Sequence, residues 1–316
     1  MILLDILNYT LIVLSALIVI FIIFFILCGY FGASITFKRK DGPVDPKKYS
    51  DHNTFENKLD VDFYENEEIR EKVCIKSYDG LDLFAYLYKN NSHNYMIFIH
   101  GYTGVYYEQS LLASFMYKNG YNCLCLINRG HAESGGKYIT MGYQDKYDVK
   151  SWVDFIVKRD KDAKICIFGR SMGGATALMT SGLDLPKNVK TIVADSAYNS
   201  IDKQIRFTAR KGIKVIPIPF IAFATYLFAK VFYKIDTKKP TSVQSAQKSN
   251  LPILLIHGTN DTFVPYEYSV EIFNSIKNDK REFKTYKDAT HCGSLCRYEE
   301  DYKHTVLEFN KKYWND

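Results

Sequence analysis

A serine between two glycines is the residue whose setting points most directly to chemistry. Residues 165–168 read Ile-Cys-Ile-Phe, and the pentapeptide 169–173, Gly-Arg-Ser-Met-Gly, leads from them into a run of small residues. A strand that turns sharply into a helix through Gly-Xaa-Ser-Xaa-Gly exposes the serine hydroxyl at the helix N-terminus, where partial positive charge favours a developing anion. Larger side chains at Gly169 and Gly173 would clash with the neighbouring strand and helix. The pattern predicts that Ser171 is a nucleophile.

A serine hydroxyl needs a general base, and the base needs a carboxylate to orient it. His291 follows a predicted strand close to the C-terminus and is the expected base. Asp261 ends the sequence His-Gly-Thr-Asn-Asp after another predicted strand, and we expect it to hold the histidine in the correct tautomer. Asp195, at the end of the preceding strand, is the competing acid. His100 and His257 each precede a glycine at a strand end and are interpreted as structural.

Strand-like apolar runs alternate with helical patterns along the body of the chain. Residues 73–77 and 81–88 flank the turn Tyr-Asp-Gly at 78–80, which predicts a hairpin. Further strands, several with the continuous apolar runs typical of a buried parallel sheet, are predicted at 95–99, 121–127, 164–168, 191–194, 252–256 and 282–286. Helices are predicted at 108–119, 145–159, 171–181, 266–276 and 298–313. This order predicts an α/β fold with a mostly parallel central sheet flanked by helices.

The order Ser171, Asp261, His291, each just beyond a strand, resembles the α/β-hydrolase superfamily over about residues 70–316. The other motifs that carry the resemblance are Ile-His-Gly-Tyr-Thr-Gly at 99–104, Leu-Ile-His-Gly-Thr-Asn-Asp at 255–261 and Thr-His at 290–291. A further turn, Asn-Arg-Gly-His-Ala-Glu-Ser at 128–134, is similar to a family turn that is usually structural, with Asn128 in place of the acid and Ala132 in place of a glycine. Within the superfamily the chain resembles the membrane-anchored, serine-aminopeptidase-like (S33/S9-like) branch of small serine hydrolases.

The resemblance implies acyl transfer without a bound metal or organic cofactor. Ser171 would attack a carbonyl, His291 would take its proton, and the backbone N–H groups of Tyr102 and Met172 would form the oxyanion hole. The expected function is a serine hydrolase that cleaves carboxylic esters, including apolar or lipid-like acyl esters, through an acyl-enzyme intermediate. A serine peptidase of the aminopeptidase type is the alternative. A non-catalytic membrane scaffold is the third interpretation, and the intact serine, acid and histidine argue against it.

A long apolar stretch predicts one N-terminal transmembrane helix. Residues 6–37 contain no charged side chain, and a spanning helix needs about 20 apolar residues. A cleaved signal peptide is the alternative, but no Lys or Arg precedes the run, and the run exceeds the roughly 7–15 residues of a signal core. Lys38, Arg39 and Lys40 follow the span and only Asp5 precedes it, so the positive-inside rule places the catalytic domain of this single-pass membrane protein in the cytoplasm.

Composition excludes several other classes of protein. A chain of 316 residues that is 47% hydrophobic is neither a disordered chain nor a disulfide miniprotein. The formal net charge of +6 is too weak and too scattered for nucleic acid, so the expected partners are the membrane lipid bilayer and a small-molecule ester, lipid or short-peptide substrate. Cys292 and Cys296 beside His291 allow a metal pair to be considered, but no other residues match a zinc spacing.

These observations divide the chain into an anchor at 1–40, a polar linker at 41–60 and an α/β-hydrolase domain at 61–316. The segment at about 201–240 is long, basic and apolar where a short loop and helix would suffice. We expect it to form a lid over the pocket. Two other interpretations are that it lies on the bilayer with its lysines toward the headgroups, and that it is a second spanning helix, which the prolines in its middle disfavour.

Overall fold

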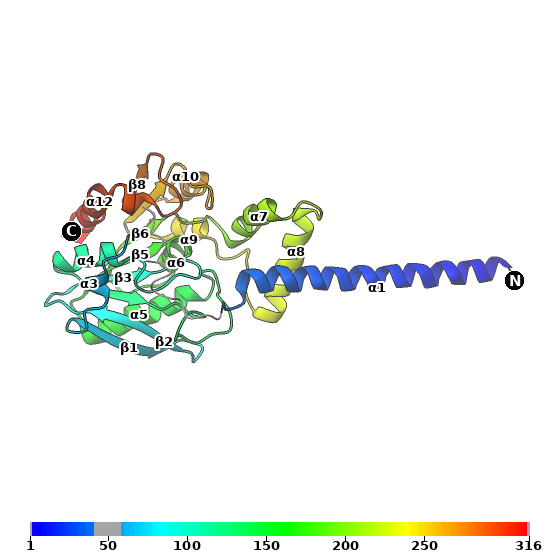
Figure 1. Cartoon of the computed structure of the whole chain (residues 1–316), viewed down its shortest axis with the longest axis horizontal. Helices are drawn as coiled ribbons and strands as arrows, with labels where there is room; N and C mark the ends of the chain where they lie inside the picture. The colour runs from blue at the N-terminus through cyan, green and yellow to red at the C-terminus, as the bar shows by residue number, and fades with distance from the viewer. Residues whose placement is uncertain (1, 41–57, 315–316) are drawn as a thin grey trace.

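The central element of the computed structural model, which describes residues 2–40 and 58–314, is an eight-stranded sheet (Figure 1). Most of the linker expected at 41–60 lies outside the described residues. The strands run in the order β1-β2-β4-β3-β5-β6-β7-β8. Their bounds are Arg70–Lys76 (β1), Asp82–Tyr88 (β2), Asn94–Ile99 (β3), Asn122–Leu126 (β4), Lys164–Arg170 (β5), Val189–Asp195 (β6), Ile253–Gly258 (β7) and Arg281–Tyr286 (β8). The first two form the predicted antiparallel hairpin, β2 pairs antiparallel with β4, and all remaining pairs are parallel.

Helices cover both faces of the sheet, so the predicted architecture is confirmed. One face carries α3 (Val61–Tyr64), α4 (Ser110–Lys118) and α12 (Glu299–Trp314). The other carries α5 (Asp145–Arg159), α6 (Met172–Ser181), α9 (Ser242–Lys248) and α10 (Tyr266–Ser275). Because successive side chains of a strand point to opposite faces of the sheet, the core has two parts. Met96 and Phe98 of β3 face the first set of helices, and Ile97 and Ile99 face the second. A further short helix, α11 (Ser294–Arg297), precedes α12.

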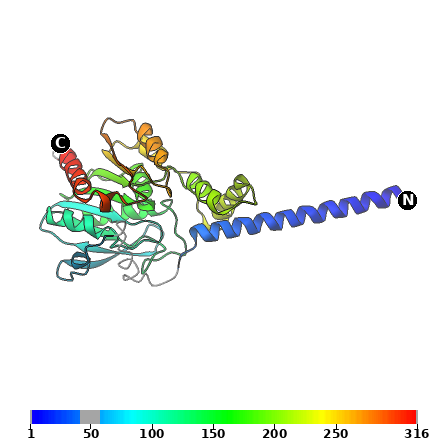
Figure 2. The ribbon, with the colours of Figure 1, turned by 45° about the horizontal axis from the view of Figure 1, so that its top comes forward.

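The segment expected to be a lid forms helices beyond the C-terminal end of β6. They are α7 (Ile201–Gly212), α8 (Ile218–Phe228) and a π-helical turn, η1 (Ala229–Tyr233). In Figures 1 and 2 they project from the sheet toward the long N-terminal helix, and α8 lies against that helix. The 11 residues of α8 fall short of the roughly 20 that a spanning helix requires.

The N-terminal helix α1 (Ile2–Phe37) extends far beyond the domain (Figure 1). It is the one helix among the described residues that is long and apolar enough to cross a membrane, by length and composition. Its last turns pack into the domain, where Ala33 and Phe37 are fully buried. The backbone oxygen of Phe37 accepts a hydrogen bond from the Ile139 N–H (2.7 Å), and Ser34 Oγ lies 3.0 Å from the Tyr233 hydroxyl.

Candidate active site

The turn between β5 and α6 has the geometry that the glycine spacing predicts. Ser171 sits at φ +58° and ψ −116°, a conformation that L-residues rarely adopt, and its N–H donates to the Asp195 backbone oxygen at 2.8 Å. A Cβ atom on Gly169 would lie 2.0 Å from the Gly173 oxygen, and one on Gly173 would lie 1.9 Å from the Ile99 oxygen. Both positions therefore require glycine, and the strained turn presents Ser171 at the N-terminus of α6.

The structure brings Ser171, His291 and Asp261 into one hydrogen-bonded chain. His291 Nε2 lies 2.9 Å from Ser171 Oγ, and His291 Nδ1 lies 2.7 Å from Asp261 Oδ2. The serine follows β5, the acid follows β7 and the histidine follows β8, so the three side chains meet at the C-terminal edge of the parallel strands. Because the Nδ1 atom faces a carboxylate, it carries the proton, and Nε2 is free to accept the serine proton.

Asp195, the competing acid, forms hydrogen bonds with residues other than His291. Asp195 is buried, and its two carboxylate oxygens accept hydrogen bonds from the Ser196 hydroxyl and the Tyr302 hydroxyl, each at 2.9 Å. It has no hydrogen bond to His291 among the described residues, so Asp261 alone of the two acids orients that histidine.

Asp261 is held by four donors. Its Oδ1 accepts the backbone N–H groups of Phe263 and Val264, each at 2.8 Å. Its Oδ2 accepts from His257 Nε2 (3.1 Å) as well as from His291. Burial opposes ionisation, but the hydrogen bonds from the two histidines hold the pKa of the Asp261 carboxyl well below its usual range. The carboxylate is therefore charged at neutral pH.

His257, which the sequence indicates only as a structural residue, belongs to this network. Its Nε2 faces two acceptors, the Asp261 carboxylate and the Val264 backbone oxygen, so that atom carries the proton. Its Nδ1 then accepts from the Ser269 hydroxyl at 2.6 Å. The side chain is fully buried and positions the acid. The four-residue spacing from His257 to Asp261 is the one signal in the sequence, and spacing alone does not show that the two side chains meet.

The surroundings of His291, the expected base, change the pKa of its imidazole. Burial alone would lower the pKa of its imidazole, but the neighbouring Cys292 and the Asp261 carboxylate raise that pKa above its ordinary value. The ring lies 4.9 Å from that of Phe263, a side chain that is 47% exposed. The Nδ1 atom of His291 is thus held by Asp261, and its ring borders the exposed side chain of Phe263.

The loop after β3 is shaped to present a backbone donor. The N–H of Gly101 donates to Glu108 Oε1 (2.7 Å), and the N–H of Thr103 donates to His131 Nε2 (3.2 Å). Within the part of the chain that the structure describes, the backbone N–H of Tyr102, between them, has no acceptor. Met172 is the first residue of α6, where an N–H has no intrahelical partner. Both donors of the expected oxyanion hole are therefore unengaged.

His100 supports the same loop from beneath. Burial lowers the pKa of both His100 and His131 to about 4, so both rings are neutral at physiological pH. The Nδ1 of His100 donates to the Gly101 oxygen, and its Nε2 accepts the N–H of Asn128 at 3.1 Å. The Asn128 amide donates back to the His100 oxygen, a bond that the usual aspartate at this position could not make when ionised. Sequence reasoning missed the supporting roles of Glu108 and His131.

The described residues contain no group of three or more His, Cys, Asp or Glu side chains that could hold a metal ion. Cys292 and Cys296 are both free thiols. The groups that meet at the C-terminal edge of the strands are a serine, a histidine, a carboxylate and two backbone donors.

Comparison with known proteins shows the family to which the chain is similar. The sequence model of the family described as serine aminopeptidase, S33, matches residues 90–245 and 227–293. The uncharacterized protein YqkD of Bacillus subtilis is 26% identical over 83% of this chain and 88% of its own length. The uncharacterized protein YfhR of Escherichia coli is 23% identical over 59% of this chain and 59% of its own length.

A solved structure extends the likeness to the fold. The esterase Pf2001 of Pyrococcus furiosus superposes with a TM-score of 0.65 at 26% identity, covering 87% of this chain and 96% of that protein. The sheet order, the strained serine turn and the family match all indicate the same fold. The chain has the α/β-hydrolase fold and belongs to the serine aminopeptidase S33 family of hydrolases.

Proposed function

We propose that this hydrolase cleaves carboxylic esters with Ser171 as nucleophile, His291 as base and Asp261 as the orienting acid, and that α1 anchors it in a membrane. The observation that carries the proposal is the unbroken hydrogen-bonded chain from the serine to the buried carboxylate, at 2.9 and 2.7 Å. The likeness to an esterase at 26% identity favours esters over peptides as the first substrate class to test.

The geometry supports a two-step mechanism. His291 Nε2 takes the hydroxyl proton as Ser171 Oγ bonds to the ester carbonyl carbon, and the N–H groups of Tyr102 and Met172 stabilise the oxyanion. The protonated histidine, paired with Asp261, gives the proton to the departing alcohol as the ester C–O bond breaks. Water, deprotonated by the same histidine, then attacks the acyl-enzyme and releases the carboxylic acid. The serine and the histidine return to their starting states.

The packing of α1 favours a retained anchor over a cleaved signal peptide. Its final turns contribute Ala33 and Phe37 to the same apolar cluster as Met172 and Ala175 of α6. The backbone of Arg39, just beyond the helix, donates to the Lys137 oxygen at 3.0 Å. Removal of α1 would expose this cluster beside the nucleophile. The charge bias around the helix favours a cytoplasmic position for the catalytic domain. Labelling of a cysteine introduced near residue 50 by an impermeant reagent from outside intact cells would contradict that orientation.

The catalytic assignment is tested by ester turnover of the detergent-solubilised full chain. We expect hydrolysis of p-nitrophenyl acetate by the wild type, and at least a 10³-fold lower kcat in Ser171→Ala and His291→Ala. Ser151→Ala and His93→Ala are matched controls, because the Ser151 hydroxyl donates to the Tyr147 backbone oxygen of its own helix and His93 pairs with Asp160 at the surface. A folded wild type without turnover, or equal activity in the site variants, would contradict the proposal. Aminoacyl p-nitroanilides in the same assay test the peptidase alternative.

A further inference from the structure

The helix α8 packs on the part of α1 that is expected to lie in the membrane. The ring of Phe220, near the start of α8, lies 5.9 Å from those of Phe21 and Phe24 and 5.4 Å from that of Phe25. Contacts between the two segments extend to Ser34 of α1 and Tyr233 at the end of η1. Residue numbers rise toward the domain in both segments, so α1 and the α8–η1 segment run in the same direction.

Small residues make this approach close. A Cβ atom on Gly29 would lie 2.7 Å from the backbone oxygen of Ala224, and one on Gly32 would lie 2.0 Å from the Thr225 hydroxyl. Glycine, alanine and threonine at a helix crossing are typical of helices that associate inside membranes, where close backbone contact replaces the hydrophobic effect. The crossing thus has the composition of a membrane interface.

Helix length and the position of the charged residue of α1 indicate the level of this contact. The 36 residues of α1 span about 54 Å at 1.5 Å per residue, whereas the hydrocarbon core is about 30 Å thick and takes about 20 residues. If the core begins just after Asp5, the only charged residue of α1, it ends near Phe25. Phe220 contacts Phe24 and Phe25, so the start of α8 lies at the boundary between hydrocarbon and headgroups.

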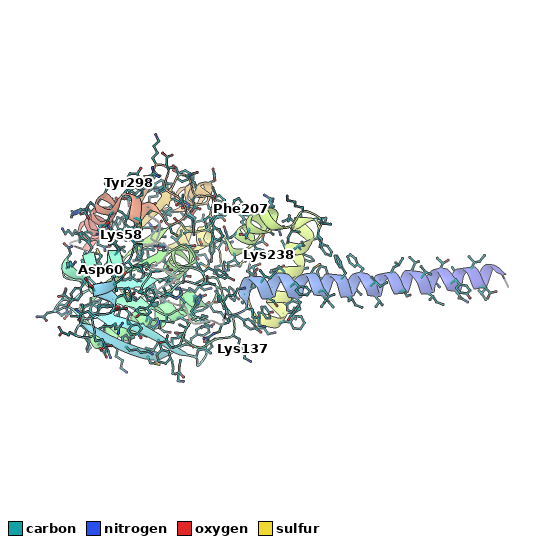
Figure 3. The ribbon with its side chains drawn as sticks, in the orientation of Figure 1. Lys58, Asp60, Lys137, Phe207, Lys238 and Tyr298 are labelled. Atoms are coloured by element: carbon teal, nitrogen blue, oxygen red, sulfur yellow. The ribbon has the colours of Figure 1, made fainter. Side chains whose placement is uncertain are left out.

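The α7–α8 connection and α8 expose apolar side chains from that level toward the domain. Val215, which precedes the start of α8, is 93% exposed, Phe223 is exposed in the middle of α8, and Val231 and Phe232 are exposed in η1, nearer the domain. Basic side chains lie among them: Lys238 Nζ is 4.1 Å from the centre of the Tyr226 ring, and Figure 3 shows Lys238 beside α8 where this helix meets α1. Exposed apolar side chains with a lysine beside them are typical of an element that lies in the membrane interface.

The same elements border the candidate active site on two sides. On one side, Gln204 of α7 donates to the backbone oxygen of Phe263 at 3.0 Å, and the Phe263 ring contacts His291. On the other side, the Tyr102 hydroxyl donates to the backbone oxygen of Ile35, in the last turns of α1, at 3.1 Å. Elements that reach the membrane thus contact the loop that carries the Tyr102 N–H directly and His291 through Phe263.

We infer that α7, α8 and the end of α1 form an entrance at the membrane surface, through which the long acyl chain of an ester dissolved in the bilayer reaches Ser171. The inference rests on the proposed function and names its substrate class: long-chain acyl esters presented by a bilayer, rather than short esters from water. It also assigns the segment 201–240 to the membrane interface rather than to a lid that faces water.

A pair of substrates with one leaving group tests the inference. The full chain is reconstituted in phosphatidylcholine vesicles and assayed with p-nitrophenyl palmitate in the bilayer and p-nitrophenyl acetate in water. We expect Val215→Asp to lower kcat/KM for the palmitate at least 10-fold and to change that for the acetate less than twofold. Val61→Asp is the matched control, because Val61 is 41% exposed and neighbours Asp60, which lies at the end of the domain away from α1 (Figure 3).

The outcomes separate the two proposals. Equal effects of Val215→Asp on both substrates, or no effect on the palmitate, would overturn the membrane entrance and leave the esterase proposal standing. Absence of turnover of both the palmitate and the acetate by the folded wild type would instead overturn the esterase proposal.

A depth measurement gives a second readout that does not depend on activity. Val215→Trp and Val61→Trp are each placed in vesicles whose acyl chains carry bromine, which quenches tryptophan on contact. The native Trp152 and Trp314 are buried in the domain and supply a constant background. We expect the added fluorescence of Val215→Trp to be quenched at least twofold more than that of Val61→Trp, and equal quenching would overturn the inference.

Discussion

Replacement of Asp261 by Asn should disable the base while leaving the fold in place. The backbone N–H groups of Phe263 and Val264 both point at Oδ1, at 2.8 Å. They require an acceptor, so the carbonyl oxygen of the asparagine must take that place. Its NH₂ group then replaces Oδ2 and faces His291. Because NH₂ donates only, the histidine must accept at Nδ1 and carry its proton on Nε2, the atom that lies 2.9 Å from Ser171 Oγ.

The expected loss follows from that tautomer. A histidine protonated at Nε2 cannot accept the serine proton, and the same change in a serine-protease triad lowers kcat about 10⁴-fold, or about 5.5 kcal/mol of barrier. We expect Asp261→Asn to lower kcat by about 10³- to 10⁴-fold. Loss of charge-assisted hydrogen bonds from His257 and His291 should also reduce the free energy of unfolding by about 1.5–3 kcal/mol.

The assay is steady-state hydrolysis of p-nitrophenyl acetate by the detergent-solubilised full chain, with circular dichroism to confirm folding. Asp195→Asn is the matched control, because that carboxylate accepts hydrogen bonds from Ser196 and Tyr302 and, among the described residues, has none with His291. We expect the control to lose less than 10-fold in kcat. A folded Asp261→Asn enzyme within 10-fold of the wild type, or a larger loss in Asp195→Asn, would refute the assignment of the acid.

Two further predictions follow from the same site. Because the pKa of His291 is raised above its ordinary value of about 6.5 and the base must be neutral, kcat/KM should fall with falling pH through a midpoint above 6.5; a midpoint at or below 6.5 in a pH–rate profile would count against this reasoning. A Cβ on Gly173 would lie 1.9 Å from the Ile99 oxygen, so Gly173→Ala should lower kcat more than 100-fold and lower the Tm, whereas Gly212→Ala, with open space around the new Cβ, should change neither. Wild-type turnover in Gly173→Ala would show that the turn is not constrained as described.

Much of the fold could be predicted from the sequence because its signals are local. The strands β3 to β7 are short apolar runs, and the helices between them begin and end near turn residues, so their order predicts the parallel sheet. The serine turn was predictable for the same reason, since the glycines that avoid the backbone of Ile99 and Gly173 lie within five residues of one another. The helix α9 was missed because Ser-Val-Gln-Ser-Ala-Gln-Lys has little apolar periodicity; the capping box at Thr241 and Gln244 is the signal in the sequence that marks its start.

The remaining features depend on contacts between distant parts of the chain. His257 supports Asp261 only because the loop after β7 folds back over its own strand. The packing of α8 on α1 joins residues about 200 positions apart, such as Gly29 and Ala224, and no periodicity within either helix reveals the other as its partner. Sequence patterns predicted that each apolar segment must be covered or lie in lipid, and the structure shows which segments meet.

The most direct test of the central claim, that Ser171 is a nucleophile activated by His291, is to locate a covalent adduct. Full-length protein in membranes is treated with a fluorophosphonate, digested and analysed by mass spectrometry. The account predicts one adduct, on the peptide that contains Ser171, and its loss in both Ser171→Ala and His291→Ala. An adduct on another residue, or one that persists in Ser171→Ala, would contradict the assignment, as would the absence of any adduct on a folded wild type.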